Sequence, residues 1–197
     1  MKISIEKNII FKSLSHVQSI VEKKNTIPIL SNILIEAKDN ILTLSATDMD
    51  ISINETINCN VIDPGSITVS AHTLYEIIRK IPEGDEIEFI SNDGKRFSVR
   101  SGNSKFSLAC LPKEDFPIIE MGQLKSELVF DSQVLLNLIN KTRFAVSNEE
   151  TRYFLNGIYL HKKRLENKDY LCLVATDGHR LAKIDFAYTD GLLDLPG

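Results

Sequence analysis

The sequence contains no tryptophan and only three cysteines. Cys59, Cys110 and Cys172 are far apart, odd in number and form no Cys-x-x-Cys pair. This pattern argues against a disulfide framework and a zinc site, and it favours a reducing compartment. The four histidines show no ligand spacing either. With aromatic residues at only 7%, a protein that reads single strands base by base through stacking is disfavoured.

The sequence also lacks any apolar run near the roughly 18 residues that a membrane helix needs. The first residues, Met1 to Glu6, alternate apolar and polar side chains like a strand and contain no apolar core of a signal peptide. We therefore expect a cytoplasmic protein with no membrane segment, no cofactor and no metal.

The 197 residues suffice for one or two domains with a sizeable core. Turn signals separate short apolar segments, and the order strand, helix, three strands occurs twice before residue 111. The expected strands are 3–6, 29–37, 41–46, 50–57, 66–70, 86–90, 96–100 and 105–110, and the expected helices are 8–24 and 71–81.

The same order begins a third time near residue 127, with a strand at 127–131, a helix at 132–145 and a strand at 153–160. Apolar positions of the first copy recur at an offset of 125, so that Ile10 matches Leu135 and Ile33 matches Ile158. After a longer hairpin the offset becomes 129, and "LTLSATD" (42–48) matches "LCLVATD" (171–177). We interpret this as a tandem duplication with its boundary near residues 122–126.

Charge is distributed unevenly over a chain whose net charge is −4. Each expected helix carries more basic than acidic residues, so the negative charge is expected on the sheets and loops. Anions such as DNA phosphates would then meet the helical layer. Lysines that merely solvate exposed helix faces are the alternative.

The stretch "ATDGHRLA" (175–182) places an acid, a glycine, a histidine and an arginine side by side. Asp177-Gly178 predicts a turn between two strands, from whose end His179 and Arg180 project. A hydrolase or nucleotide-binding enzyme that uses Asp177 and His179 is one alternative, but the sequence has no P-loop, GxGxxG, GxSxG or HExxH motif. An interaction scaffold unrelated to DNA is another.

Several motifs in this order resemble the bacterial sliding clamp family, the beta subunit of DNA polymerase III. They are "TIPILSNILI" (26–35), "IPEG" (81–84), "VRSG" (99–102), "FSL" (106–108), "LPKEDFP" (111–117), "RYFLNG" (152–157) and "ATDGHRLA". The resemblance implies a non-enzymatic processivity factor with the α+β DNA-clamp fold, in which repeated β-α-β-β-β units carry their helices on one face of antiparallel sheets. Members of this family have three such domains and form a head-to-tail homodimeric ring around double-stranded DNA.

By this resemblance, residues 1–124 form the first clamp domain and 125–197 the N-terminal half of the second, while the third domain is absent. The resemblance also assigns three groups of residues, and no catalytic or metal-binding residue. A groove for short linear motifs of DNA polymerase subunits and the clamp loader comprises Arg152, Leu155, Thr176, Gly178, His179, Arg180 and Leu181. The DNA-facing group comprises Lys24, His72, Arg79 and Tyr153 by the resemblance; Lys23, Lys80 and Lys141 are added to it as further basic residues of the expected helices. The ring interface comprises Leu74, Ile77, Arg96, Lys105, Phe106 and Leu108, with Phe106 and Leu108 expected as an exposed pair.

Two positions depart from the family pattern. His72 stands where a permanently charged side chain is common, and Glu149 stands where an uncharged glutamine is familiar. A carboxylate at position 149 is expected to repel phosphate.

Overall fold

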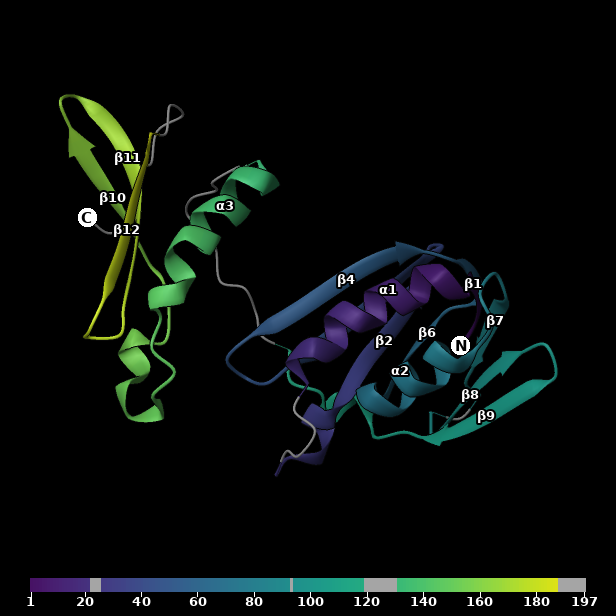
Figure 1. Ribbon diagram of the computed structural model, residues 1–197. Helices are drawn as coiled ribbons and strands as arrows, with labels where there is room; N and C mark the ends of the chain where they lie inside the picture. Colours follow the sequence, from purple (N-terminus) through teal and green to yellow (C-terminus); the bar gives the residue numbers. More distant parts are fainter. Residues whose placement is uncertain (22–25, 93, 119–130, 188–197) are drawn as a thin grey trace. The chain divides into compact units, whose positions relative to one another are not determined.

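The computed structural model describes residues 1–21, 26–92, 94–118 and 131–187, and the chain divides into two compact units, Met1–Glu120 and Met121–Gly197. Within the described residues, no helix is long and apolar enough to cross a bilayer. Each unit combines helices with antiparallel sheets, which is the expected α+β class (Figure 1).

Unit 1 contains two antiparallel sheets and two α-helices. One sheet has the strand order β5-β1-β7-β8-β9 and the other β4-β3-β2-β6. The strands are β1 (Lys2–Glu6), β2 (Asn32–Lys38), β3 (Ile41–Thr47), β4 (Ser52–Asn58), β5 (Asn60–Asp63), β6 (Gly65–Ser70), β7 (Glu86–Ile90), β8 (Arg96–Ser101) and β9 (Ser104–Ala109). The helices are α1 (Lys7–Val17) and α2 (Ala71–Lys80), and three short 3₁₀ segments are η1 (Gln18–Ile20), η2 (Pro28–Ser31) and η3 (Lys113–Asp115).

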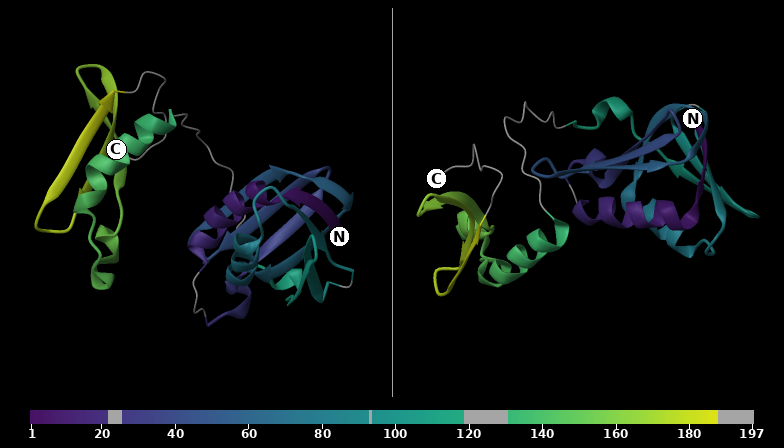
Figure 2. Two further views of the ribbon diagram at one scale, coloured as in Figure 1. Left: turned by 45° about the vertical axis from the view of Figure 1, so that its right-hand side comes forward. Right: turned by 90° about the horizontal axis from the view of Figure 1, so that it is seen from above.

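The core of unit 1 lies between the sheets and the helices. Helix α1 contacts β1, β3 and β4, whereas α2 contacts β2 and β6. The two helices lie side by side (Figure 2), and the rings of Phe11 and Tyr75 stack between them with centroids 5.4 Å apart. Phe89 and Phe97, at a centroid distance of 4.9 Å, are fully buried beneath them. Burial of these alternating apolar side chains is the main stabilising term of the unit.

Residues 131–187, the described part of unit 2, form one α-helix and one three-stranded sheet of order β10-β11-β12. Its elements are α3 (Ser132–Thr142), η4 (Arg143–Ala145), η5 (Glu150–Leu155), β10 (Tyr159–Leu165), β11 (Lys168–Thr176) and β12 (Leu181–Ala187). Helix α3 packs on β11 and β12 through Leu138, Leu171 and Leu173. The Asp131 carboxylate caps the helix by accepting hydrogen bonds from the backbone N–H groups of Gln133 and Val134.

The positions of the elements support the duplication. Adding 125 to the bounds of α1 and η1 gives those of α3 and η4, and adding 129 to the bounds of β4 gives those of β12. The hairpins also match, because Asp39-Asn40 and Glu166-Asn167 both have positive φ at two successive residues, as type I′ turns require.

The loop after β3 and the loop after β11 are each closed by the same pattern of hydrogen bonds. In unit 1 the Thr47 hydroxyl donates to the Ile51 carbonyl at 2.8 Å, and the Asp48 carboxylate accepts from the N–H groups of Asp50 and Ile51. In unit 2 the Thr176 hydroxyl donates to the Arg180 carbonyl at 2.8 Å, and the Asp177 carboxylate accepts from the N–H groups of His179 and Arg180. The repeated Ala-Thr-Asp sequence is therefore a turn-closing device.

Several predicted elements differ from the structure. The helix predicted at 8–24 ends at Val17 and continues as a 3₁₀ turn to Ile20. In this turn the Ser19 hydroxyl donates to the His16 carbonyl and so competes with the backbone hydrogen bonds of a continued α-helix. The prediction of a strand at 153–160 is wrong for its first half, because residues 150–155 form the 3₁₀ segment η5 and β10 begins at Tyr159. Strand β5 is absent from the prediction. The predicted strand at 127–131 and the duplication boundary fall almost entirely outside the described residues.

We predict that Thr68→Val lowers the unfolding free energy of unit 1 by about 1–3 kcal/mol, because buried polar groups lose their partner. The fully buried Thr68 hydroxyl donates to the Leu111 carbonyl, accepts from the Leu111 N–H and also accepts from the Asn32 amide. Urea unfolding measures the change. Thr56→Val, the same change at an exposed position of β4, is the control, and equal losses in the two variants contradict the prediction.

We predict that Gly178→Ala destabilises unit 2 by about 1 kcal/mol, because Gly178 has φ +88° and side chains disfavour this region. Gly157→Ala is the control, since no atom lies within 4 Å of its added Cβ. At the matching position of unit 1, Met49 holds φ +83°, so Met49→Gly is expected to stabilise that unit. Hydrogen exchange of β11 and β3 amides reports each unit separately. A Met49→Gly variant that is less stable than the parent protein contradicts this account.

Candidate functional site

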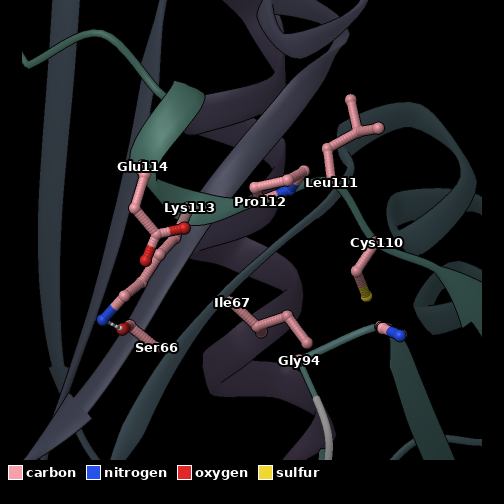
Figure 3. A pocket seen from close by; sticks show the side chains of 9 residues that line it. Ser66, Ile67, Gly94, Cys110, Leu111, Pro112, Lys113 and Glu114 are labelled. Atoms are coloured by element: carbon pink, nitrogen blue, oxygen red, sulfur yellow. Dashed lines mark hydrogen bonds between the residues drawn. The ribbon is translucent and has the colours of Figure 1, made fainter.

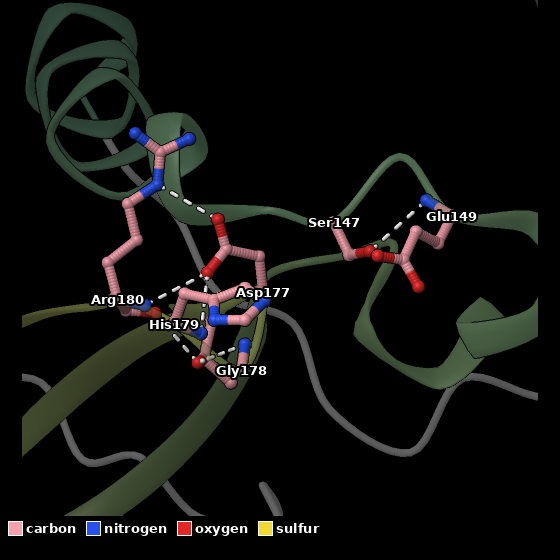
Figure 4. Close-up of polar contacts among 7 residues, drawn as sticks. Ser147, Glu149, Asp177, Gly178, His179 and Arg180 are labelled. Atoms are coloured by element: carbon pink, nitrogen blue, oxygen red, sulfur yellow. Dashed lines mark hydrogen bonds and ion pairs between the residues drawn. The ribbon is translucent and has the colours of Figure 1, made fainter.

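The turn of residues 176–180 presents the side chains that the sequence singled out. Arg180 donates from Nε to Asp177 Oδ2 at 2.9 Å, and the Asp177 Oδ1 atom accepts from the N–H groups of Arg180 and His179 (Figure 4). These hydrogen bonds, that of the Arg180 N–H above all, hold the pKa of the Asp177 carboxyl at about 2. Such a group is ionised at neutral pH and engaged by the backbone, so it is a structural cap and a poor general base.

A second arginine, Arg152, lies beside this turn at Gly178. Arg152 lies in η5, at a residue with non-helical φ and ψ angles, and its Nη1 atom is 3.2 Å from the place that a Cβ of residue 178 would occupy. Glu149 pairs with Arg152, with Oε2 3.1 Å from Nε. The Glu149 carboxylate, which was expected from the sequence to repel phosphate, therefore forms an ion pair with Arg152.

Apolar side chains flank these charges. Leu181, the first residue of β12, is 63% exposed, and Leu155, the last residue of η5, is half-buried. The Leu155 carbonyl accepts from the N–H of Ser147, which joins η5 to the segment after η4. We call Arg152, Leu155, Thr176, Gly178, His179, Arg180 and Leu181 the unit 2 corner. The Arg152 guanidinium lies beside Gly178, and a hydrogen bond within one turn joins Thr176 to Arg180.

The expected DNA-facing residues are divided among several elements. His72, Arg79 and Lys80 are exposed on α2, although Arg79 pairs with Glu76 at 2.7 Å. In unit 2, Lys141 is exposed near the end of α3 and Tyr153 is 79% exposed in η5. Lys23 and Lys24 lie outside the described residues.

The expectation that the sheets carry the negative charge is wrong for unit 2. Its strands contain Lys162, Lys163, Arg164, Lys168 and Lys183, against only Asp169 and Asp185. Two of these lysines pair across the strands, Lys162 with Asp169 and Lys163 with Asp185. Many acidic side chains of the described chain, including Asp39, Asp48 and Asp50, lie instead in turns.

The expected ring-interface residues do not all reach the surface. Leu74 is fully buried and Leu108 is 7% exposed, because both belong to the core of unit 1. The expected exposed pair of Phe106 and Leu108 is therefore wrong for Leu108. Strand alternation places both side chains on the same face of β9, but Leu108 lies opposite the buried Phe97 and packs into the core of unit 1. Phe106 is 36% exposed on β9, Arg96 and Lys105 are exposed, and Ile77 is half-buried on α2.

No catalytic constellation is visible among the described residues. A cavity of about 350 Å³ in unit 1 is lined by Ser66, Cys110 and Lys113, among others, and Lys113 donates to the Ser66 hydroxyl at 2.9 Å (Figure 3). It contains neither Asp177 nor His179. In unit 2, burial raises the pKa of the Cys172 thiol to about 11, which opposes a role as a nucleophile. Within the described ranges, no group of three or more His, Cys, Asp and Glu side chains is placed to hold a metal ion.

Comparison with known proteins gives a consistent result along the chain. The family model described as "DNA polymerase III beta subunit, N-terminal domain" matches residues 1–120, and the model of the central domain of the same subunit matches residues 129–192. The beta sliding clamp of Caulobacter vibrioides is 46% identical over the whole of this chain, and that of Escherichia coli is 36% identical over 92% of it.

Solved structures agree with the sequence relatives. A Caulobacter crescentus beta sliding clamp covers the whole chain with a TM-score of 0.95 and 46% identity, and a Pseudomonas aeruginosa sliding clamp covers it with a TM-score of 0.88 and 31% identity. The chain covers 52% and 51% of those two chains, and it spans about half the length of the curated relatives it matches. The chain belongs to the DNA polymerase III beta subunit family.

Proposed function

We propose that this chain is part of a sliding clamp, a non-enzymatic processivity factor that encircles double-stranded DNA and tethers polymerases to it. In this proposal residues 1–124 form the first clamp domain and 125–197 the first half of the second, and the whole protein is a cytoplasmic homodimeric ring. The observation that carries the proposal is the order of the two family matches on a duplicated chain. The relatives that span this chain are named beta sliding clamps.

The exposed basic residues suit a protein that holds DNA without reading its sequence. Lysine and arginine side chains on helices give a diffuse, salt-sensitive attraction to phosphates and carry no base information. His72, Lys80, Lys141 and Tyr153, all exposed, form the proposed DNA-facing group together with Lys23, Lys24 and the partly neutralised Arg79. Topological closure, rather than tight contact, then keeps the protein on DNA.

The unit 2 corner is the proposed docking site for short linear motifs of polymerase subunits and the clamp loader. Leu181 and Leu155 offer apolar contact, while Arg152, His179 and Arg180 offer hydrogen-bond donors at the rim. The proposed ring interface uses Ile77, Arg96, Lys105 and Phe106, without the buried Leu74 and Leu108.

The alternative of an enzyme that uses Asp177 and His179 has no support in the geometry, because the Asp177 carboxylate is engaged by the turn. A scaffold unrelated to DNA is separated from a clamp by experiment.

We expect the full-length protein, loaded by its clamp loader, to remain on a nicked circular duplex through gel filtration and to leave once the duplex is linearised. Encirclement requires this difference, because a closed ring leaves a linear duplex only over its ends. Equal retention on the two DNA forms excludes a clamp.

Affinity for duplex DNA, measured with the full-length protein at several salt concentrations, tests the DNA-facing group. Lys80→Gln is expected to lower the slope of log affinity against log salt by about 1, as the loss of one phosphate contact does. Lys38→Gln, at an exposed end of β2 outside the helical layer, is the control and is expected to leave the slope unchanged. A slope equally reduced in both variants removes the helical layer as the DNA-facing surface.

We expect Leu181→Ala to weaken binding of the purified polymerase and loader subunits about tenfold or more, as loss of a central apolar contact does at other interfaces. Titration by fluorescence anisotropy measures the loss. Leu165→Ala, at the far end of β10 and 43% exposed, is the matched control. Unchanged binding by Leu181→Ala places the docking site elsewhere.

A further inference from the structure

The guanidinium of Arg180 is held on two sides. Its Nε atom donates to Asp177 Oδ2 at 2.9 Å, and its central carbon lies 5.8 Å from the ring centroid of Phe144. Phe144 belongs to η4, at the end of α3, and is 56% exposed. A cation at this distance over an aromatic face is attracted by the ring quadrupole, which is negative at the face of the ring.

Both corner arginines are contacted by an acid at Nε. The Asp177 carboxylate reaches Arg180 at Nε, and the Glu149 carboxylate reaches Arg152 at Nε. Among the contacts of residues 131–187, neither acid bonds the terminal nitrogens of its arginine. In Figure 4 the outer end of the Arg180 side chain points away from the turn and from Glu149. A guanidinium fixed through Nε keeps its paired terminal N–H groups available for a planar carboxylate.

Unit 1 provides an internal comparison. It keeps the Thr-Asp turn, yet the position that matches Arg180 holds Ile51, the position that matches Phe144 holds Ser19, and the position that matches Arg152 holds Ile27. The turn therefore folds without the aromatic ring and without either arginine. An exposed phenylalanine and the arginine above it occur together in unit 2 and are both missing from unit 1, so turn formation does not account for them.

An exposed phenylalanine also contributes little to the core of unit 2. The described core clusters of this unit are built from residues such as Leu138, Leu171 and Ala175, and Phe144 belongs to neither. Within residues 131–187, the Phe144 ring instead contacts the Arg180 guanidinium.

We propose that Phe144 is a positioning residue: together with Asp177 it holds the Arg180 guanidinium so that its terminal N–H groups bind a carboxylate of the partner segment in the unit 2 corner. The inference rests on the proposed docking function and adds to it a chemical class, an acidic peptide. Unit 1, with Ile51 at the matching position, lacks this selectivity.

The positioning is tested in the 197-residue chain without any partner. In wild-type protein the ring current of Phe144 is expected to shift the NMR signals of the Arg180 Nε–H and Cδ protons, because the guanidinium carbon lies 5.8 Å from the ring centroid. Phe144→Leu keeps an apolar side chain and removes the aromatic face, so these signals are expected to move to ordinary values while the amide signals of β11 and β12 stay in place. Phe154→Leu removes an exposed ring whose recorded partner is Tyr153 and is expected to leave Arg180 unchanged. Arg180 signals that ignore Phe144→Leu overturn the positioning role.

The selectivity is tested with a peptide library displayed on phage and selected on the same chain. Peptides from wild-type protein are expected to be enriched in Asp and Glu. For one selected acidic peptide, Phe144→Leu is expected to weaken binding about two- to fivefold, the loss of one exposed cation–π contact. The Asn or Gln version of that peptide is expected to bind wild type and variant alike.

The outcomes separate the two proposals. If no peptide is selected on the wild-type chain, or if selected peptides ignore Leu181→Ala, the docking function of the corner is wrong, while the NMR result still decides the role of Phe144. If Phe144→Leu weakens the acidic and the amide peptide equally, the ring contributes only apolar contact and the proposed acidic selectivity is wrong.

Discussion

The closed turn at the end of the β3–β4 and β11–β12 hairpins is the interaction on which the rest of the structure depends. A threonine hydroxyl and an aspartate carboxylate, adjacent in sequence, satisfy the polar groups of the loop from within. The loop then requires no partner from elsewhere to remain ordered. Because the network uses only Thr and Asp side chains, the turn forms in both units although the next three residues differ: they are Gly178, His179 and Arg180 in one unit, and Met49, Asp50 and Ile51 in the other. The Asp-Gly-His-Arg cluster, which resembles catalytic machinery in sequence, therefore forms the turn that joins β11 to β12.

The sequence predicted the fold well wherever periodicity and turn chemistry act locally. Alternation placed β3, β7 and β8, and the offsets between the copies anticipated that α3 repeats α1. The failures occur where a few hydrogen bonds outweigh propensity. Tyr153 and Phe154 favour a strand, but the carbonyl of Tyr153 accepts from the N–H of Asn156 in a tight turn, and both rings remain exposed. The edge strand β5 escaped prediction because its pairing with β1 is a long-range contact that no local pattern reports.

The sequence named the residues of the candidate site, but it did not show which side chains contact one another. "ATDGHRLA" indicated a turn from which His179 and Arg180 project, and the structure confirms that turn. The partners of the arginines were not visible, since Phe144 is far from Arg180 in sequence and Glu149 entered the sequence argument only through its charge. The sequence also misplaced Leu74 of α2 and Leu108 of the edge strand β9, because an apolar residue looks the same in sequence whether its side chain faces a partner or the core. Residue identity therefore gives the chemistry of a site, and the direction of each side chain decides whether that chemistry is available.

The charge that a surface offers likewise depends on which basic side chains are already paired with an acid, and not only on whether a helix or a sheet carries them. The strands of unit 2 are rich in lysine, yet Lys162 and Lys163 are paired with Asp169 and Asp185 across the sheet. On the helical layer Arg79 shares its charge with Glu76, whereas Lys80 beside it is exposed with no ion pair recorded within the described residues. Phosphates respond to charges that are not already neutralised by a neighbour. Among the described residues, the positive charge of the helical layer that is not neutralised by a neighbour therefore belongs to separate cations such as Lys80. In the proposed clamp such cations suit weak, mobile contact, because a protein that stays on DNA and still moves along it is served by a closed ring and harmed by strong local binding.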